Sequence, residues 1–389
     1  MARTIRRAVS CATCHEPDAQ MTDGLSLAVG TGGTGRAPGR ALGAGRQFVP
    51  RNAPTILNMG LGLFYTLWDG RVNEEFGPGF FNVPADVPLP SGLNNLVAAQ
   101  AMFPVLSRVE MRGQPGDTDV SGNANELAAI ADSDPNAVWQ AAMARLVAVQ
   151  EYVAKFNAAY PNIPASQLRF QHAANAIAAF QIATFTKKNS PFDRYLARDN
   201  SALTEEQKRG ALLFFGKGGC SSCHQGALLG GRQFANIGIP QIGPGVGAAA
   251  PLDIGRAEHM PAGSQQFYRF SFRVPTLRNV ELTAPYMHNG AFKTLETVVR
   301  HYTNPDSSLR NYDVTQLDPA LRPLVRNDPT TIADVLQTLD GRFRFAEIRL
   351  TAEEQTQIVA FLKSLTDPEA RNLADVVPAA VPSGLSVRD

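Results

Sequence analysis

The sequence predicts a mainly helical protein of two domains, each built around one short cysteine–histidine motif, with long loops between the helices. Two observations predict this class. Helical patterns of apolar residues recur along the chain, whereas convincing strand patterns are scarce. The pentapeptide C-x-x-C-H occurs twice, as CATCH at 11–15 and as CSSCH at 220–224. We expect the N-terminal domain to cover 1–190 and the C-terminal domain to cover 200–389.

The cysteines decide what these motifs hold. The chain has 4 cysteines, and all of them lie in the two motifs: Cys11, Cys14, Cys220 and Cys223. The pairs are much further apart than the roughly 15–20 residues of a zinc ribbon, so each pair acts alone. A histidine directly after C-x-x-C is the signature of a covalently attached c-type haem. We predict two haem c groups with His15 and His224 as proximal iron ligands, and the alternative is a metal or redox pair at each motif.

Length and composition exclude some classes of protein. The chain has 389 residues, 44% of them hydrophobic, which is enough for more than one core. A formal net charge of +1 with no large Lys/Arg cluster argues against nucleic acid as a partner. No run reaches the eighteen or so apolar residues of a membrane span. The start MARTIRRAVS leaves no room for a secretion signal before the first motif. Because bacteria attach haem c outside the cytoplasm, we expect a periplasmic protein whose N-terminus is truncated or mis-started.

Helices are predicted in both halves. Residues 137–160 are expected to form one helix and 167–185 another. A capping box at Thr204 and Gln207 begins a short helix that leads into the second motif. A second capping box, at Thr351 and Glu354, begins an amphipathic helix whose apolar face comprises Ile358, Phe361, Leu362 and Leu365. A helix entering C-x-x-C-H and an amphipathic helix closing the unit are what a cytochrome c domain needs.

The segments between these helices are expected to be connections. Residues 30–46 and 226–256 are rich in glycine and proline and should be loops. Gly30, Gly32 and Gly35 match G-x-G-x-x-G, but the proline and glycines that follow prevent the helix that a nucleotide site requires. The linker between the two domains is expected at 187–201.

With the motifs placed, the sequence resembles the bacterial di-haem cytochrome c peroxidases and their relatives, including MauG. The matching stretches are SCATCHEP, RNAPTILN at 51–58, LWDGR at 67–71, AAQAMFPVLSRVEM at 98–111, GCSSCHQG at 219–226 and FRVPTLRNVELTAPYMHNGAFKTLETVV at 272–299. They cover most of the chain outside 72–92, 112–165 and the C-terminal tail. The resemblance implies two cytochrome c-like haem domains, with peroxide bound at the first haem.

The resemblance also implies roles for three side chains. Gln100 lies on the apolar stripe of a predicted helix, and its counterpart in the family lies over the peroxide-binding haem. Glu110 matches the distal carboxylate, which can take a proton from peroxide and return it to the departing oxygen. Trp68 matches the tryptophan between the haems. Without the resemblance, these three would be interpreted as a satisfied amide, a surface carboxylate and a core aromatic residue.

A calcium site between the domains is implied as well. Asn52 and the backbone carbonyls of Thr283 and Pro285 match the ligands of that site, and all three offer the oxygen atoms that Ca²⁺ prefers. His288 lies in the same turn, where a structural hydrogen bond and an electronic role both stay open.

Two departures from the family pattern concern the irons. Many members carry a histidine after the first motif that blocks the first iron, but this chain has none between His15 and His172. We therefore expect the first haem to be open at rest. The sixth ligand of the second haem is a methionine in ordinary peroxidases, and the matching position here is Tyr302, as in MauG. The alternatives are Met287, whose thioether suits electron transfer, and a core role for Tyr302.

Three functions stay open at this stage. The first is a peroxidase that reduces hydrogen peroxide with electrons from a small cytochrome or a cupredoxin. The second is a MauG-like oxidase acting on a protein or small molecule, although Gly218 stands where MauG has its surface tryptophan. The third is a di-haem electron carrier, which would not explain Gln100 and Glu110. The sequence leaves the oligomeric state, including a homodimer, undecided.

Overall fold

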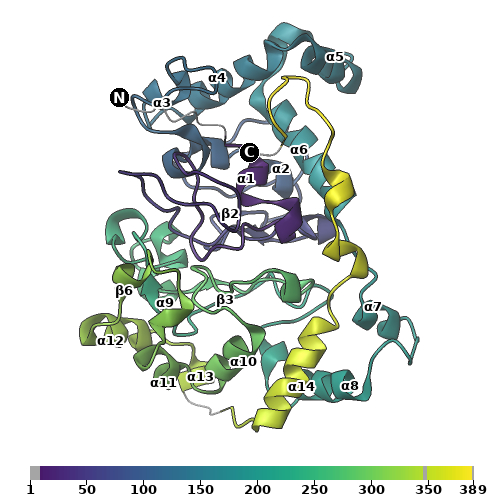
Figure 1. The fold of residues 1–389 in the computed structure, drawn as a ribbon, viewed down its shortest axis with the longest axis vertical. Coiled ribbons are helices and arrows are strands. Elements are labelled where there is room, and N and C mark those ends of the chain that lie inside the picture. The colour runs from purple at the N-terminus through teal and green to yellow at the C-terminus, as the bar shows by residue number, and fades with distance from the viewer. Residues whose placement is uncertain (1–8, 345–347, 388–389) are drawn as a thin grey trace.

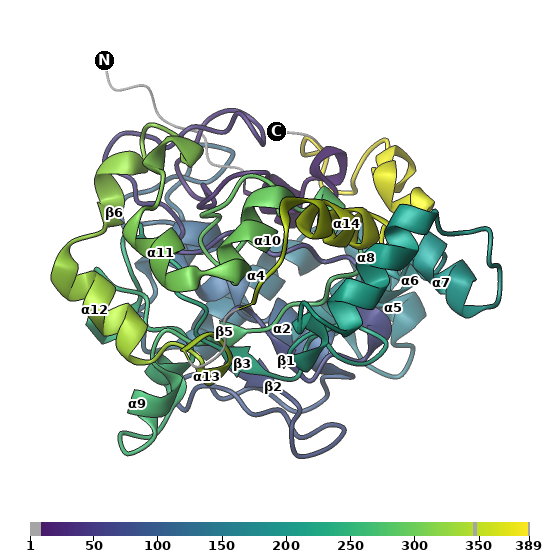
Figure 2. The same cartoon turned by 90° about the horizontal axis from the view of Figure 1, so that it is seen from below.

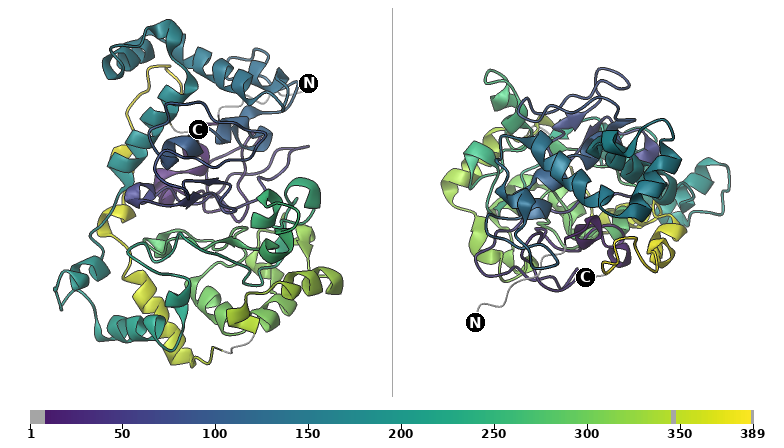
Figure 3. Two further views of the ribbon diagram at one scale, coloured as in Figure 1. Left: turned by 180° about the vertical axis from the view of Figure 1, so that it is seen from behind. Right: turned by 90° about the horizontal axis from the view of Figure 1, so that it is seen from above.

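The computed structural model describes residues 9–344 and 348–387, and it is mainly helical as predicted. Two bodies lie one above the other in Figure 1, the upper formed by the N-terminal half and the lower by most of the C-terminal half. The view from behind shows the same two bodies (Figure 3). No described helix is long and apolar enough to cross a lipid bilayer.

The upper body contains the helices that precede the linker. They are α1 (Cys11–Cys14), α2 (Leu96–Ala101), α3 (Glu126–Ala129), α4 (Pro135–Val147), α5 (Gln150–Ala159) and α6 (Phe170–Phe185). Met102, Trp139, Met143, Phe156 and Phe170 are buried in one apolar core, on which α2, α4, α5 and α6 pack. A π-helical turn, Arg108–Arg112, follows α2 and carries Glu110.

The prediction of one helix over 137–160 was wrong. The structure has two helices there, α4 and α5, and Val149 between them is extended, with φ −101° and ψ 111°. Trp139 and Met143 of α4 share a core with Phe156 of α5. The break lets both helices pack on the same core, a tertiary demand that outweighs the continuous helical pattern. The next predicted helix, 167–185, is present as α6 but begins at Phe170.

The lower body contains the helices that follow the linker. They are α8 (Glu205–Phe215), α9 (Gln265–Tyr268), α10 (Leu295–Thr303), α11 (Pro305–Arg310), α12 (Pro329–Gln337), α13 (Gly341–Arg344) and α14 (Ala352–Lys363). Both capping boxes are confirmed, at Thr204 and Gln207 of α8 and at Thr351 and Glu354 of α14. The predicted apolar face of α14 is also confirmed, because its four residues are buried.

Helices α8 and α14 lie side by side, as the view from below shows (Figure 2). Gly210 makes this close crossing possible, because a Cβ atom there would meet the carbonyl oxygen of Gln357 and the Cβ of Phe361. The two helices form one wall behind the second C-x-x-C-H motif, since Phe214, Ile358 and Phe361 belong to the same apolar cluster as Cys220.

Three short antiparallel pairs complete the fold: β1 (Tyr65–Thr66) with β2 (Val72–Asn73), β3 (Phe234–Ala235) with β5 (Phe272–Arg273), and β4 (Gln241–Ile242) with β6 (Val325–Arg326). In the first pair Tyr65 faces Asn73 and Thr66 faces Val72, so the hairpin presents LWDGR at its tip. Residues 30–46 are irregular, as predicted, and 226–256 hold only β3, β4 and a 3₁₀ turn.

The predicted linker contains a short helix, α7 (Pro191–Leu196), begun by a capping box at Ser190 and Asp193. The chain after α14 runs back along the side of the molecule to the upper body (Figure 1). There Ala370 and Leu373 pack in one cluster with Met21, Ile56 and Phe185. The C-terminal tail therefore packs against the N-terminal half, while the domain limits 1–190 and 200–389 stay a prediction.

Candidate haem and peroxide site

The two C-x-x-C-H motifs have the same local structure. Each begins with a helical turn, α1 in the first and a 3₁₀ turn (Cys220–Ser222) in the second, and none of the four cysteines forms a disulfide. Nδ1 of His15 donates to the carbonyl of Met21 at 3.1 Å, and Nδ1 of His224 donates to that of Leu229 at 2.9 Å. Since a carbonyl can only accept, this bond leaves Nε2 of each ring as the unprotonated nitrogen that can bind iron.

Burial keeps both histidines neutral. It lowers the pKa of His15 below its ordinary value and lowers the pKa of His224 to about 4. A neutral imidazole with an oriented ring is the form that ligates a metal. Both motifs therefore fit the axial role that the sequence predicts.

A cavity of about 500 Å³ adjoins the second motif, within the roughly 300–1,000 Å³ that ligand pockets span. Cys220, Cys223 and His224 line it, together with apolar side chains such as Phe214, Leu295, Val299 and Leu362. Thiols and a neutral imidazole on a mostly apolar wall match a covalently held haem. The residues present therefore fit the predicted group.

Both candidates for the sixth ligand reach this cavity. Tyr302 of α10 lines it, and the nearby thiols of Cys223 and Cys220 contribute to the raised pKa of the phenol, whose largest cause is burial. Met287 also lines it and has a positive φ of 80°. The structure brings both side chains to the site, so the choice between them stays a prediction.

The same cavity extends to the seam between the two bodies. Asn52, Thr283 and Pro285, the expected calcium ligands, all line it, as do Trp68 and His288. The amide Nδ2 of Asn52 donates to the carbonyl of Leu25 at 2.7 Å. His288 stacks on Phe272 with ring centroids 3.5 Å apart, and burial lowers its pKa to about 3. Within 9–344 and 348–387, no cluster of three or more His, Cys, Asp or Glu could hold a metal.

Trp68 bridges the two bodies. Its indole Nε1 donates to the carbonyl of Asn52 at 2.8 Å, and its own carbonyl accepts from the backbone N–H of Arg273 at 2.8 Å. The β1–β2 hairpin holds this residue at its tip. Trp68 thus lies at the seam between the two bodies and lines the cavity of the second motif, while its inter-haem role stays a prediction.

Glu110 lies beside the first motif. Cys14 and Val109 pack on one small cluster, and the charge of Glu110 contributes to the raised pKa of the Cys14 thiol, whose largest cause is burial. Burial raises the pKa of Glu110, while Arg71 and Arg51 act in the opposite direction. A carboxyl group whose pKa is raised in this way is suited to accepting a proton and returning it.

Gln100 occupies the last turn of α2, as the helical pattern predicts. Its side-chain oxygen Oε1 is buried, and no hydrogen-bond partner for it exists among the described residues. A buried amide oxygen without a partner is costly unless a ligand or water satisfies it. This favours a ligand-binding site next to the Gln100 side chain over a structural amide that is hydrogen-bonded to the backbone.

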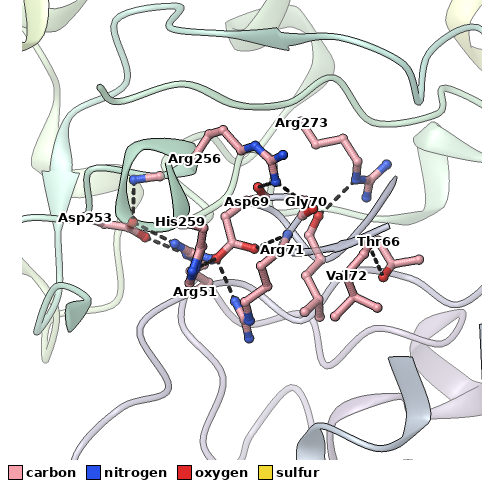
Figure 4. A network of polar contacts seen from close by, with 12 residues as sticks. Arg51, Thr66, Asp69, Gly70, Arg71, Val72, Asp253, Arg256, His259 and Arg273 are labelled. Atoms are coloured by element: carbon pink, nitrogen blue, oxygen red, sulfur yellow. Dashed lines mark hydrogen bonds and ion pairs between the residues drawn. The ribbon is translucent and has the colours of Figure 1, made fainter. Parts of the chain in front are cut away.

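A charge network centred on the buried Asp69 was not predicted from the sequence (Figure 4). Asp69 accepts from Arg51 at 2.5 Å and from Arg71 at 2.6 Å, and His259 lies 3.2 Å away. Arg51 also binds Asp253 through two nitrogen atoms, at 2.7 and 2.8 Å. Asp69 and Arg71 belong to the LWDGR motif, which the sequence analysis identified. Their partners could not be predicted because they lie far away in the sequence. The network joins the two bodies and places two guanidinium groups near Glu110.

Comparison with known proteins identifies the family. Residues 4–201 match the family described as di-haem cytochrome c peroxidase, CCP_MauG. The chain is 30% identical to the methylamine utilization protein MauG of Methylorubrum extorquens, over 76% of this chain and 63% of that protein. It is also 30% identical to the cytochrome c551 peroxidase of Pseudomonas aeruginosa, over 86% of this chain and 73% of that protein.

The chain belongs to the di-haem cytochrome c peroxidase family. Family membership confirms the predicted resemblance and implies two haem c groups in an oxidoreductase. The chain spans less than two thirds of the length of the MauG relative and about three quarters of that of the peroxidase relative.

Solved structures agree on the fold. A MauG-like protein associated with microbial copper homeostasis superposes with a TM-score of 0.59 at 24% identity, covering 96% of this chain and 89% of that chain. The diheme peroxidase BthA from Burkholderia thailandensis gives a TM-score of 0.58 at 19% identity, covering 98% and 86%. The architecture is therefore that of di-haem peroxidases and MauG-like proteins.

Proposed function

We propose that this protein is a di-haem c-type peroxidase that reduces hydrogen peroxide to water with two electrons from a small cytochrome or a cupredoxin. Each turnover consumes one peroxide, two electrons and two protons, and it yields two waters. The observation that carries the proposal is the half-buried Glu110 on a π-helical turn that packs beside Cys14, where burial raises the pKa of its carboxyl group.

In this proposal the first motif holds the haem at which peroxide reacts. A c-type haem supplies an iron that binds peroxide and accepts electrons one at a time. The carboxylate of Glu110 takes a proton from peroxide and returns it to the oxygen that leaves as water. The unpartnered Oε1 of Gln100 accepts a hydrogen bond and orients the bound molecule. Although burial raises the pKa of Glu110 overall, Arg71 and Arg51 act in the opposite direction and favour the ionised form that a base requires.

Electrons are proposed to enter at the second motif. His224 would hold that haem, and Trp68, which lines the same cavity and donates to the carbonyl of Asn52, would be the residue that electrons pass toward the N-terminal half. We also propose calcium at Asn52, Thr283 and Pro285, because these three line one cavity and offer oxygen ligands. Since covalent attachment of haem takes place outside the bacterial cytoplasm, we propose a periplasmic location.

A MauG-like oxidase is the second candidate, and Tyr302 favours it. Gly218 speaks against it, because a Cβ there would lie 2.9 Å from the carbonyl oxygen of Leu213 and 3.3 Å from Cδ1 of Ile358. A bulky side chain therefore does not fit at this position without movement of α8 or α14.

The holoprotein should oxidise reduced cytochrome c in the presence of peroxide. Consumption of peroxide that leaves the cytochrome reduced would instead favour the oxidase.

The ligand of the second iron is tested by two variants. If Tyr302 binds it, Tyr302→Phe should change the low-energy ferric absorption and raise the reduction potential, because loss of an anionic oxygen destabilises Fe(III) more than Fe(II). Met287→Leu should then leave the spectrum nearly unchanged. A sulfur-to-iron band that disappears only in Met287→Leu would establish Met287 as the ligand and support the electron-transfer design of an ordinary peroxidase.

A further inference from the structure

A loop that follows the first motif runs along the turn that carries Glu110. The backbone N–H of Thr31 donates to the carbonyl of Val109 at 3.0 Å. The hydroxyl of Thr31 donates to the carbonyl of Arg108 at 2.7 Å. Thr31 is only 5% exposed, so both bonds are shielded from water. The residues directly before Glu110 are therefore held by a segment almost eighty positions away in the sequence.

The carbonyl of Val109 needs a partner from outside its own turn, whereas that of Arg108 already accepts from the N–H of Gly113. The turn is π-helical, with Arg112 N–H bound to the carbonyl of Ser107 at 2.9 Å and Gly113 N–H bound to that of Arg108 at 3.1 Å. It ends at Arg112, so the carbonyls of its last residues lack the donors that a longer helix would supply. Thr31 provides one such donor to Val109 and a second donor to Arg108.

Gly30 allows the loop to come this close. A Cβ atom at Gly30 would meet the carbonyl oxygen of Val109 and would lie 2.5 Å from that of Glu110 and 2.8 Å from the Cα of Glu110. All three are backbone atoms, which cannot rotate aside as a side chain could. Gly30 belongs to a glycine pattern that lacks the helix required for nucleotide binding. Its role is instead steric, because it allows the loop to approach the Glu110 turn.

Arg40 fixes the other side of the loop. Its guanidinium donates to the carbonyls of Val29 at 2.7 Å, Gly30 at 3.0 Å and Gly35 at 2.8 Å. Arg40 is 8% exposed. The planar, buried guanidinium of Arg40 lies on one side of the loop and the Glu110 turn lies on the other, so the loop has little freedom to move.

We infer that the clamp formed by Gly30, Thr31 and Arg40 positions the carboxyl group of Glu110, with Thr31 as the positioning residue. The inference rests on the proposed acid–base role of Glu110. A carboxylate that transfers protons must stay within hydrogen-bond reach of the peroxide, and a misplacement of about 1 Å can cost about 100-fold in rate. The chain carries no histidine in this region that could compete for the first iron. The loop here serves to support the site.

The test compares the wild-type holoprotein with four single variants and one double variant. Thr31→Val removes the hydroxyl donor at nearly constant volume, and Thr31→Ser retains it. Thr34→Val is the matched control, because Thr34 is exposed in the same loop. We expect Thr31→Val to lower peroxidase kcat by about 10- to 100-fold, and Thr31→Ser and Thr34→Val to stay within about 2-fold of wild type. Hydrogen exchange of the amides in 108–113 should quicken only in Thr31→Val.

The double variant separates positioning from general stability. If Thr31 acts through Glu110, adding Thr31→Val to Glu110→Gln should cost little further activity, since the effects of residues acting as a unit are not additive. If Thr31→Val lowered kcat by the same factor in the wild type and in Glu110→Gln, the inference would be overturned. Unchanged hydrogen exchange or unchanged kcat in Thr31→Val would also overturn it. A normal rate in Glu110→Gln would overturn the proposed role of Glu110 and the positioning inference together, whereas a slow Glu110→Gln beside a normal Thr31→Val would overturn the clamp alone.

Discussion

Glu110→Gln should lower peroxidase kcat by at least about 100-fold while both haems remain attached, because general acid–base groups contribute roughly 10²–10⁴ to rate. Glutamine keeps the size and most of the shape of the side chain, but it cannot take up and return a proton. Steady-state turnover with peroxide and reduced cytochrome c measures the rate. The absorbance of the denatured protein counts the haems.

The matched control is Glu126→Gln, since Glu126 is an exposed carboxylate paired with Arg145 at the start of α3. That variant should turn over at the wild-type rate. In the wild type, the rate should rise with pH as Glu110 ionises. Because burial raises the pKa of Glu110, this rise should lie above the ordinary value of about 4.3. The pH profile of Glu110→Gln should lack this rise. A near-normal rate in the variant would show that Glu110 has no acid–base role in the reaction.

Asp69→Asn should destabilise the protein by about 3–5 kcal/mol, which is the usual cost of removing one partner from a buried ion pair. Asp69 is fully buried, and its carboxylate accepts from Arg51 and Arg71. The neutral amide would leave Arg51 paired with Asp253 and would remove the carboxylate with which Arg71 pairs. Urea unfolding of the holoprotein, followed by circular dichroism, measures the free energy of unfolding.

The control for Asp69 is Asp306→Asn, which breaks the exposed pair with Arg310 and should cost at most about 1 kcal/mol. Although burial alone would raise the pKa of Asp69, the charges of Arg51 and Arg71 hold it well below its ordinary value. Its stabilisation is therefore complete above about pH 4 and is lost as the pH falls toward the folded-state pKa. The difference between wild type and Asp69→Asn should shrink over that range. Equal losses in both Asp variants would contradict the importance of the network.

Features that depend on neighbours a few residues apart were predictable. The capping boxes of α8 and α14 need only residues three positions apart, and both formed as expected. The C-x-x-C-H motifs also carry their chemistry in five residues, and in each the histidine is oriented by a nearby carbonyl. The polar Gln100 on an apolar stripe was visible in the periodicity of α2, and its oxygen is indeed buried.

Features that depend on distant partners were not predictable. Arg51 and Asp253 are 202 positions apart, and no local pattern connects them. The π-helical turn at Glu110 is stabilised by Thr31, which the sequence marks only as part of a glycine-rich loop. The break between α4 and α5 interrupts a continuous helical pattern, because Phe156 packs on the core that Trp139 already occupies. In each case the tertiary contact decides the outcome.

The central claim, that this chain is a peroxidase whose first haem is open at rest, is tested most directly by mixing the fully oxidised holoprotein with hydrogen peroxide and excess reduced cytochrome c. The prediction is immediate oxidation of the cytochrome, two molecules for each peroxide consumed, without prior reduction of the enzyme. A lag that disappears only after pre-reduction would contradict the open first haem. Peroxide consumed while the cytochrome stays reduced would contradict the peroxidase itself.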